Sequence, residues 1–287
     1  MRWHRAPAKL NLTLRVTGRR LDGFHDLESV VAFADVCDWL GFAPGPGFEL
    51  SVEGPGAAEI GPSAENLVVR AARALAARFP GLVMGRFRLV KRLPAAAGLG
   101  GGSSDAAACL RALAEANGLS LADDRVREAA LETGSDVPVC LTAHARSMAG
   151  TGEHLGPPLR IPALEAVLVN PRRAVATREV FEALGLERGG GRDPDRGAPS
   201  PDSVSTATLD ALELGGNDLE PAAQKVLPMI GDILDRLRRL PRVKFARMSG
   251  SGATCFAIFD APGAARDAQA SLTAEYPGWW IAATRLR

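Results

Sequence analysis

The 287-residue chain has almost no net charge, because 34 Lys and Arg residues are balanced by 33 Asp and Glu residues. A formal charge of +1 provides no long-range field for binding a nucleic-acid backbone or an anionic membrane. No apolar run is long enough to span a bilayer, and the first ten residues do not lead into the apolar segment of a secretory signal. We therefore expect a cytoplasmic protein that binds a small molecule, with no nucleic-acid and no membrane partner.

Cysteine is also scarce, with four residues at positions 37, 109, 140 and 255. They form no C-x-x-C pair and have no histidine at zinc-ligand spacing, so the pattern excludes a zinc module and predicts reduced, mostly buried thiols. A content of 46% hydrophobic and 23% charged residues is ordinary for a folded protein and excludes global disorder. The length favours two lobes over a single small core.

Strand and helix patterns alternate along the chain, which predicts an α/β (α+β) fold. Apolar Leu and Val alternate with polar Asn, Thr and Arg over residues 10–16, which predicts a half-buried strand with Lys9 and Asn11 on its other face. Further strands are expected at residues 30–42, 48–52, 86–93 and 166–170, and helices at residues 66–79, 106–117, 122–133, 177–184 and 219–240. A domain boundary is expected near residue 156, which gives domains 1–156 and 157–287. Residues 187–205 are rich in Gly, Pro and charge and predict a solvated loop.

A glycine-rich segment lies directly between a predicted strand and a predicted helix. Residues 98–105 are GLGGGSSD. Glycines let the main chain turn tightly and approach an anion, while the first N–H groups of the helix and its dipole point at that anion. The alternative is a flexible linker with an ordinary N-cap, but linkers seldom separate a strong strand from a strong helix. The segment matches neither a Walker nor a dinucleotide-binding motif, so it predicts another kind of phosphate site.

A second glycine-serine turn, MSGSGAT, occupies residues 248–254 between apolar segments. By itself this pattern favours a hairpin loop. Together with the first loop it suggests two main chains that close on one substrate.

Isolated polar residues supply the candidates for chemistry. Lys9 is one of only four lysines in a chain that prefers arginine, and a compact ammonium is suited to a reacting centre. Asp136 could act as a general base, although its spacing favours a helix N-cap. His25 could be an ordinary turn residue, and Phe24 beside it offers a face for stacking.

These segments together resemble the GHMP superfamily of small-molecule kinases, and within it the family of 4-diphosphocytidyl-2-C-methyl-D-erythritol kinases. Residues 93–107 (LPAAAGLGGGSSDAA) resemble the phosphate-binding motif of the superfamily. Residues 6–12 (APAKLNL), 18–25 (GRRLDGFH) and 135–138 (SDVP) resemble the narrower family. The resemblance runs nearly end to end and implies an N-terminal lobe like domain 2 of ribosomal protein S5 and a C-terminal lobe with an antiparallel sheet and helices.

The resemblance also implies the roles of particular residues. Lys9 and Asp136 would form the catalytic pair, and Asn11, Phe24, His25, Asp136, Thr177 and Phe181 would bind the substrate, the last two near its cytidine. The residues expected to bind ATP are Pro94, Ala95, Ala96, Ala97, Gly98, Leu99, Gly100, Gly101, Gly102, Ser103 and Ser104, with Asn66 and Lys91 near the adenosine. Phe24 replaces a tyrosine usual in the family, which retains stacking and removes a phenol hydrogen bond.

The implied reaction is phosphorylation of the 2-hydroxyl of 4-diphosphocytidyl-2-C-methyl-D-erythritol by ATP, in the non-mevalonate route to isoprenoid precursors. Mg²⁺ is expected from ATP chemistry, held mainly by the phosphates, with a Ser103 or Ser104 hydroxyl beside it and no dedicated metal site in the chain. One alternative is a GHMP kinase for a sugar, homoserine or a mevalonate-type alcohol. Another is a non-catalytic nucleotide-binding or RNA-binding module. The sequence predicts neither a monomer nor a homodimer over the other.

Overall fold

The structure is a computed structural model that describes residues 1–60, 64–191 and 208–287. The chain forms two compact units, each assembled from several segments. Unit 1 comprises Met1–Lys9, Cys37–Ala95 and Gly100–Ala143, and unit 2 comprises Leu10–Val36, Ala96–Leu99 and His144–Arg287. The chain therefore passes repeatedly from one unit to the other, whereas the expected boundary at residue 156 is a single cut and stays a prediction about the family's two domains.

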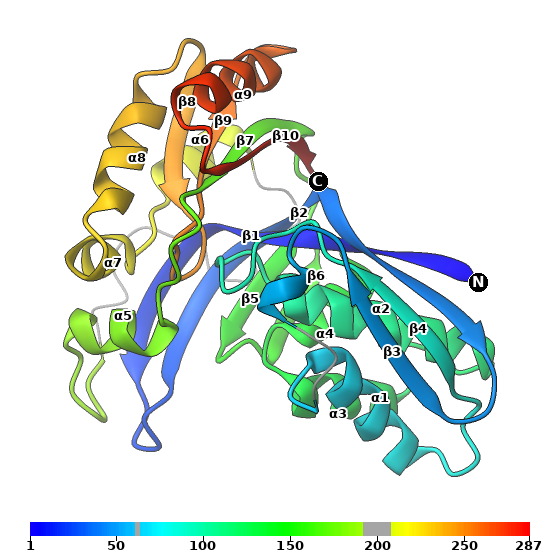
Figure 1. Ribbon diagram of the computed structural model, residues 1–287. Coiled ribbons are helices and arrows are strands. Elements are labelled where there is room, and N and C mark those ends of the chain that lie inside the picture. Colours follow the sequence, from blue (N-terminus) through cyan, green and yellow to red (C-terminus); the bar gives the residue numbers. More distant parts are fainter. Residues whose placement is uncertain (61–63, 192–207) are drawn as a thin grey trace. The chain divides into compact units, whose positions relative to one another are not determined.

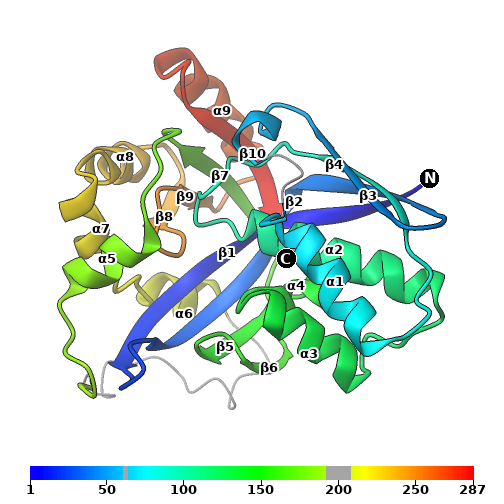
Figure 2. The ribbon, with the colours of Figure 1, turned by 60° about the horizontal axis from the view of Figure 1, so that its bottom comes forward.

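Unit 1 is built on a strand–helix–strand segment. The strands β3 (Phe48–Glu53) and β4 (Gly85–Val90) pair in parallel and are joined through the helix α1 (Leu67–Arg78). Residues 39–44 of β2 (His25–Pro44) add an antiparallel neighbour to β4. The helices α2 (Gly101–Ala116) and α3 (Asp124–Thr133) pack against α1, and α4 (Val137–Thr142) packs against α2 and α3 (Figures 1 and 2). A short 3-10 helix, η1, covers Ala57–Glu59.

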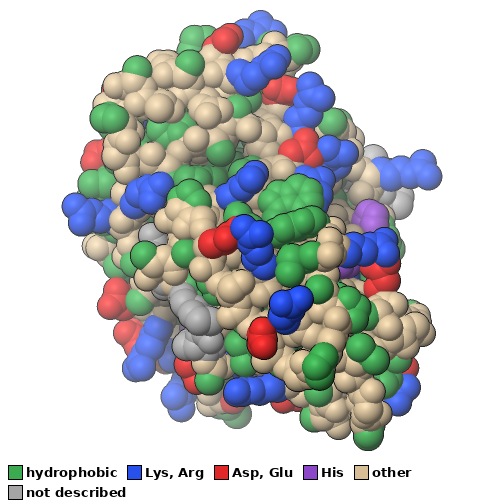
Figure 3. All heavy atoms as spheres, turned by 45° about the vertical axis from the view of Figure 1, so that its right-hand side comes forward, with side chains coloured by type: hydrophobic (Ala, Val, Ile, Leu, Met, Phe, Trp, Pro, Cys, Tyr) green, Lys and Arg blue, Asp and Glu red, His purple; other side chains and the backbone are tan. Residues whose placement is uncertain are grey.

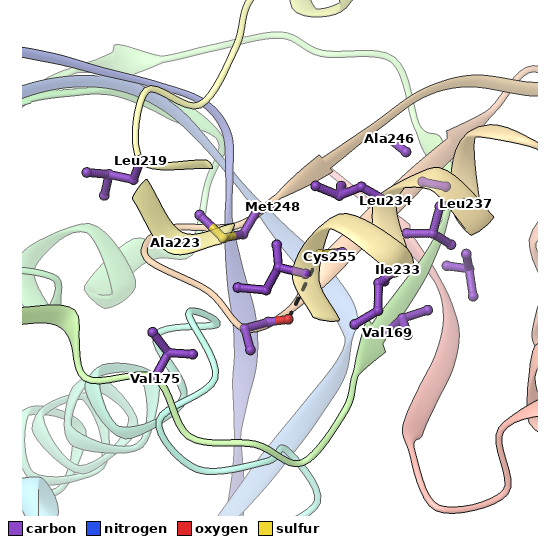
Figure 4. Close-up of a cluster of buried hydrophobic side chains, with 14 of the residues drawn as sticks. Val169, Val175, Leu219, Ala223, Ile233, Leu234, Leu237, Ala246, Met248 and Cys255 are labelled. Atoms are coloured by element: carbon purple, nitrogen blue, oxygen red, sulfur yellow. Dashed lines mark hydrogen bonds between the residues drawn. The ribbon is translucent and has the colours of Figure 1, made fainter. Parts of the chain in front are cut away.

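Unit 2 contains an antiparallel sheet in the order β10 (Trp280–Leu286), β7 (Leu164–Asn170), β9 (Cys255–Phe259) and β8 (Val243–Met248). The helices α8 (Met229–Arg238) and α9 (Ala264–Glu275) pack on these strands. The buried side chains between α8 and the sheet form a core cluster that includes Met248 and Cys255 (Figure 4).

Unit 2 also contains most of a long N-terminal strand and several shorter elements. From Leu10 onward, β1 (Arg2–Arg19) pairs with β2, which also pairs with β5 (Arg146–Gly150). The unit also contains β6 (His154–Pro158), α5 (Thr177–Leu184), α6 (Leu209–Leu214) and α7 (Glu220–Val226). The predicted α/β class, with an antiparallel sheet in the C-terminal part, is thus confirmed.

Two helix predictions need correction. The helix expected to start at residue 106 starts at Gly101. The prediction missed the first turn because that turn consists of glycines and serines, which have low helix propensity. The helix expected over residues 219–240 is two helices, α7 and α8, with Leu227 extended between them. Pro228 causes the break, since it has no N–H and disfavours helical geometry in the residue before it.

All four cysteines are buried and free, as predicted. In the solvated loop expected at 187–205, residues 192–205 lie outside the described residues, while Gly189 and Gly190 exchange main-chain hydrogen bonds with Arg19. The face drawn in Figure 3 carries interspersed acidic and basic side chains, in keeping with the balanced charge. Among residues 1–60, 64–191 and 208–287, no helix has both the length and the apolar character needed to cross a membrane.

Candidate active site

Lys9 and Asp136 form an ion pair within unit 1. The distance from Lys9 Nζ to Asp136 Oδ2 is 2.9 Å, and the Lys9 side chain is 5% exposed while that of Asp136 is 30% exposed. Asp136 occupies the N-cap position of α4, as its spacing suggests, but its side chain makes no capping hydrogen bond. A buried ammonium therefore fixes a carboxylate that is still accessible to a ligand.

The start of α2 lies beside this ion pair. Gly100 is the N-cap of α2 and has a φ of 58°. A Cβ at Gly100 would lie 3.1 Å from Lys9 Cε and 3.9 Å from Asp136 Oδ2, so the main chain approaches the pair where only glycine fits easily. The first N–H groups of a helix have no partner within the helix and carry its positive dipole end. Anion-binding amides and the Lys9–Asp136 pair are thus adjacent in unit 1.

The two serines of the glycine loop differ in their surroundings. Ser104 is fully buried, and its hydroxyl donates a 2.7 Å hydrogen bond to the main-chain oxygen of Pro7. It also lies 3.3 Å from the Cys140 thiol, whose pKa burial raises to about 12. Ser103 is only half-buried in the first turn of the helix. Of the two hydroxyls, that of Ser103 is therefore the better placed to meet a phosphate or a metal ion.

Lys91 lies between two carboxylates in the interior of unit 1. Its side chain is 1% exposed, and its ammonium pairs with Asp38 and, at 2.6 Å, with Asp105. Asp38 Oδ1 also accepts a 2.9 Å hydrogen bond from the Leu93 amide, so this carboxylate is the better satisfied of the two. Burial, with Asp38 nearby, outweighs the Lys91 charge and raises the pKa of Asp105 to about 7. In this geometry Lys91 supports the start of α2, and its contact with adenosine stays a prediction.

Asn66, also expected near the adenosine, is the N-cap of α1. Its Oδ1 accepts a 3.0 Å hydrogen bond from the Val68 amide. Asn66 is mostly buried. This hydrogen bond gives Asn66 a structural role in unit 1. Its contact with the adenosine of a nucleotide stays a prediction.

In unit 2 the second glycine-serine turn packs against residues 96–99 of the first. It is a hairpin loop, because Met248 and Cys255 are opposite one another in the β8–β9 pair. The Thr254 amide donates a 3.2 Å hydrogen bond to the Ala97 oxygen. A Cβ on Gly98 would clash with the main-chain oxygen of Ser249. The turn is therefore the hairpin loop that its pattern favoured, and it lies beside residues 96–99, while the closing of both main chains on one substrate stays a prediction.

The expected substrate-binding residues of unit 2 form separate contacts. His25 stacks on Phe181 with ring centroids 4.4 Å apart, and Thr177 Oγ1 lies 2.9 Å from Ser251 Oγ. Asn11 is buried and donates from Nδ2 to Ser29 Oγ at 2.7 Å. Phe24 is 64% exposed and accessible for stacking.

The protonation of His25 follows from its surroundings. Burial, together with the charge of Arg19, lowers its pKa from the ordinary value of 6.5. His25 Nε2 is buried and has no hydrogen-bond partner in the part of the chain that the structure describes. The ring is therefore a neutral imidazole at pH 7, with a buried polar atom that has no partner among the described residues.

Comparison with known proteins gives the family of the chain. The model of the GHMP kinases N terminal domain matches residues 66–144, and that of the GHMP kinases C terminal domain matches residues 207–278. A 4-diphosphocytidyl-2-C-methyl-D-erythritol kinase of Bradyrhizobium sp. (strain BTAi1 / ATCC BAA-1182) is 53% identical over 97% of this chain and 94% of its own. A protein of that name from Methylorubrum extorquens is 54% identical over 98% of each chain.

The chain belongs to the 4-diphosphocytidyl-2-C-methyl-D-erythritol kinase family of GHMP kinases. A crystal structure of a 4-(cytidine 5'-diphospho)-2C-methyl-D-erythritol kinase matches it with a TM-score of 0.78, at 33% identity and 99% coverage of both chains. The structure of L. major mevalonate kinase in complex with R-mevalonate matches with a TM-score of 0.67 at 17% identity, covering 100% of this chain and 96% of its own. The second likeness shows the GHMP kinase fold alone.

Sequence reasoning missed several residues that contact the members of this candidate site. Asp38 and Asp105 hold Lys91, and Ser249 joins the two loops of unit 2. A charged Asp38 within the apolar run of β2 was an available signal, since buried charges need partners. The Ser249 hydroxyl had no such signal, because serine is ordinary in a turn.

Proposed function

We propose that the chain transfers the terminal phosphoryl group of ATP to the 2-hydroxyl of 4-diphosphocytidyl-2-C-methyl-D-erythritol, with Lys9 and Asp136 as the catalytic pair. The observation that carries the proposal is the Lys9–Asp136 ion pair beside Gly100 at the start of α2. The substrate in this proposal is the one in the printed name of the relatives that match at 53% identity over nearly the full length. The reaction places the enzyme in the non-mevalonate route to isoprenoid precursors.

Asp136 accepts the proton of the attacking hydroxyl, so that the alcohol oxygen forms the new O–P bond as the bond to ADP breaks. Lys9 holds the Asp136 carboxylate in place and stabilises the negative charge that develops on the attacking oxygen. The amides at the start of α2 donate to phosphate oxygens. Because these groups are fixed before the substrate arrives, positioning and electrostatics supply most of the catalysis.

A magnesium ion fits this donor set. Mg²⁺ prefers oxygen ligands and is usually held by one or two protein groups and by substrate phosphates. The half-buried Ser103 hydroxyl is the protein oxygen that would hold it, with the phosphates as the main ligands. No group of three or more His, Cys, Asp or Glu side chains able to hold a metal occurs in the described ranges. The ion would neutralise charge on the transferring group.

The His25–Phe181 stack supports recognition of a flat, polar base such as cytosine. An aromatic pair supplies a surface for stacking, and a rotation of the His25 ring that exposes its buried Nε2 would let this atom accept a hydrogen bond from an exocyclic amine. A site built to satisfy such polar groups rejects analogues that lack them. Recognition of the cytidine end and of the alcohol end would thus depend on different residues.

The domain division into residues 1–156 and 157–287 and the cytoplasmic location belong to the same proposal. The match to the GHMP N terminal domain falls within the first range and the match to the C terminal domain within the second, which supports the division. Expression of a fluorescent fusion followed by cell fractionation tests the location.

The deciding experiment is a coupled assay of ADP release with purified enzyme, ATP, Mg²⁺ and a panel of alcohols. Transfer to the cytidylylated methylerythritol is expected, with cytidine diphosphate inhibiting competitively against it. Faster transfer to homoserine, a sugar or mevalonate would identify a GHMP kinase for another alcohol. ATP binding with no transfer to any alcohol would favour the nucleotide-binding or RNA-binding module.

A further inference from the structure

The hydroxyl of Ser249 joins two segments that are distant in the sequence. Its Oγ accepts a 3.2 Å hydrogen bond from the Asn11 amide and donates a 2.8 Å hydrogen bond to the Gly98 oxygen. Ser249 is fully buried, so no water replaces either partner. Asn11, one of the expected substrate-binding residues, lies on β1, and Gly98 lies in the glycine-rich segment. One hydroxyl thus links the main chains of both.

Ser249 is itself held firmly from both sides. Asn217 Nδ2 donates 2.8 Å hydrogen bonds to the oxygens of Met248 and Gly250, the residues before and after Ser249. The Met248 side chain is buried in the core cluster of unit 2 among Ala223, Leu234 and their neighbours (Figure 4). The Ser249 amide donates to the Thr254 oxygen across the hairpin loop. These contacts fix the position of the Ser249 hydroxyl within unit 2.

The two segments that Ser249 holds continue directly into the catalytic centre. Asn11 follows Lys9 by two residues on β1, and Gly98 precedes Gly100 by two residues. Because successive Cα atoms keep a constant spacing, a displacement at Asn11 or Gly98 propagates along the chain to these neighbours. A misplacement of about 1 Å at a reacting centre can lower a rate by about a hundredfold.

We propose that Ser249 is a positioning residue for phosphoryl transfer, whose hydroxyl sets the register between the strand of Lys9 and Asn11 and the phosphate-binding segment. This role rests on the proposed kinase function. Because Ser249 is fully buried and its hydroxyl is engaged with two main-chain groups, we expect it to act on the rate of the chemical step and to leave ligand binding largely unchanged.

The test compares Ser249→Ala, Ser249→Thr and the wild-type enzyme. In Ser249→Ala we expect kcat to fall about 10- to 100-fold, with less than a threefold change in the Kd of ATP and of the alcohol. Ser249→Thr keeps the hydroxyl and should restore most of the rate. Hydrogen–deuterium exchange should accelerate at the Asn11 amide in Ser249→Ala, because that amide loses its acceptor.

Thr284→Val is the matched control. Thr284 is also a mostly buried hydroxyl of unit 2 that accepts a hydrogen bond from a distant main chain, the Val36 amide at 3.1 Å. We expect this variant to lose stability as Ser249→Ala does and to keep its kcat within about twofold.

Equal kcat values for Ser249→Ala and Thr284→Val would show that Ser249 has only a structural role and would overturn the proposal. An unchanged rate of hydrogen–deuterium exchange at the Asn11 amide would also overturn it. The rates are measured on whichever alcohol of the panel the wild type phosphorylates. Failure of the cytidylylated substrate alone would therefore count against the proposed function and leave the Ser249 test intact.

Discussion

Asp136 is the residue on which the proposed proton transfer depends most directly. It occupies a helix N-cap position, yet its carboxylate pairs with Lys9 and makes no capping bond. A carboxylate with a capping role would have its oxygens directed to the main chain of its own helix. Because the Asp136 carboxylate is not used for capping, it is available to an alcohol.

Asp136→Asn should lower kcat by a factor of about 10² to 10⁴, because the amide keeps the shape and the contact with Lys9 but cannot accept the proton. Lys9→Ala should lower kcat by a similar factor, because the developing negative charge loses its ammonium. Steady-state assays with the cytidylylated alcohol measure both.

Asp123→Asn provides the control for Asp136→Asn. Asp123 is the N-cap of α3, and its side chain does cap by accepting from the Arg125 amide at 2.9 Å. Asparagine caps equally well, so activity and stability should both be retained. Near wild-type turnover by a correctly folded Asp136→Asn enzyme would refute the catalytic assignment.

The protonation of the single residue His25 should make substrate binding depend on pH. Its lowered pKa keeps the ring neutral at pH 7, and protonation at lower pH removes the acceptor lone pair and places a charge beside Phe181. The KM for the cytidylylated alcohol should therefore rise several-fold between about pH 7 and pH 5.

A His25→Gln variant should lose this pH dependence, because glutamine does not titrate in the range. KM measured against pH for both enzymes decides the question. An equally steep rise in His25→Gln would assign the titration to another group.

At the scale of an element, the start of α2 depends on the conformation of Gly100. A residue with a side chain at a φ of 58° costs about 1–2 kcal/mol of backbone strain, and here its Cβ would also lie 3.1 Å from Lys9 Cε. Gly100→Ala should therefore destabilise the protein by about this amount and lower kcat by at least about tenfold.

The variant Gly118→Ala is the control that separates the effect of backbone strain from the effect of a contact with Lys9. Gly118 follows α2 with a φ of 64°, and a Cβ there would meet no atom within 4 Å. We expect a similar loss of stability by urea unfolding and no loss of activity. Equal activities of the two variants would show that the approach of Gly100 to Lys9 has no part in catalysis.

At the scale of the whole molecule, the buried group of Asp38, Lys91 and Asp105 connects stability to pH. Two carboxylates around one ammonium leave a net negative charge in the interior unless one is protonated, and Asp105, with a pKa of about 7, takes the proton. The unfolded chain releases that proton near pH 4. Between about pH 4 and pH 7 the folded state therefore binds the extra proton, and this contribution to stability decreases as pH rises.

Asp105→Asn should remove this contribution, since the amide remains neutral. The free energy of unfolding of the wild type, relative to that of Asp105→Asn, should fall as pH rises from 5 to 8. Urea unfolding at several pH values measures the difference, with Glu49→Gln on the exposed side of β3 as the control. A constant difference would show that Asp105 is ionised throughout.

Much of the molecule follows from local sequence. The alternation over residues 10–16 located β1, and the glycine-rich segment located the turn before α2, because both patterns depend on neighbours a few residues apart. The same local reasoning placed Asp136 at a helix start. It failed at Pro228, where a single residue divides an otherwise continuous helical pattern.

The sequence by itself determined the fold class through its periodicity and the family through its motifs, and it predicted a phosphate-binding role for the glycine-rich segment. Only the tertiary structure decided that Asp136 pairs with Lys9, that Lys91 lies between Asp38 and Asp105, and that the Ser249 hydroxyl bonds to an amide 238 residues away. Such contacts are made by packing between distant segments, where the partner of a polar group is fixed by which other groups are buried beside it.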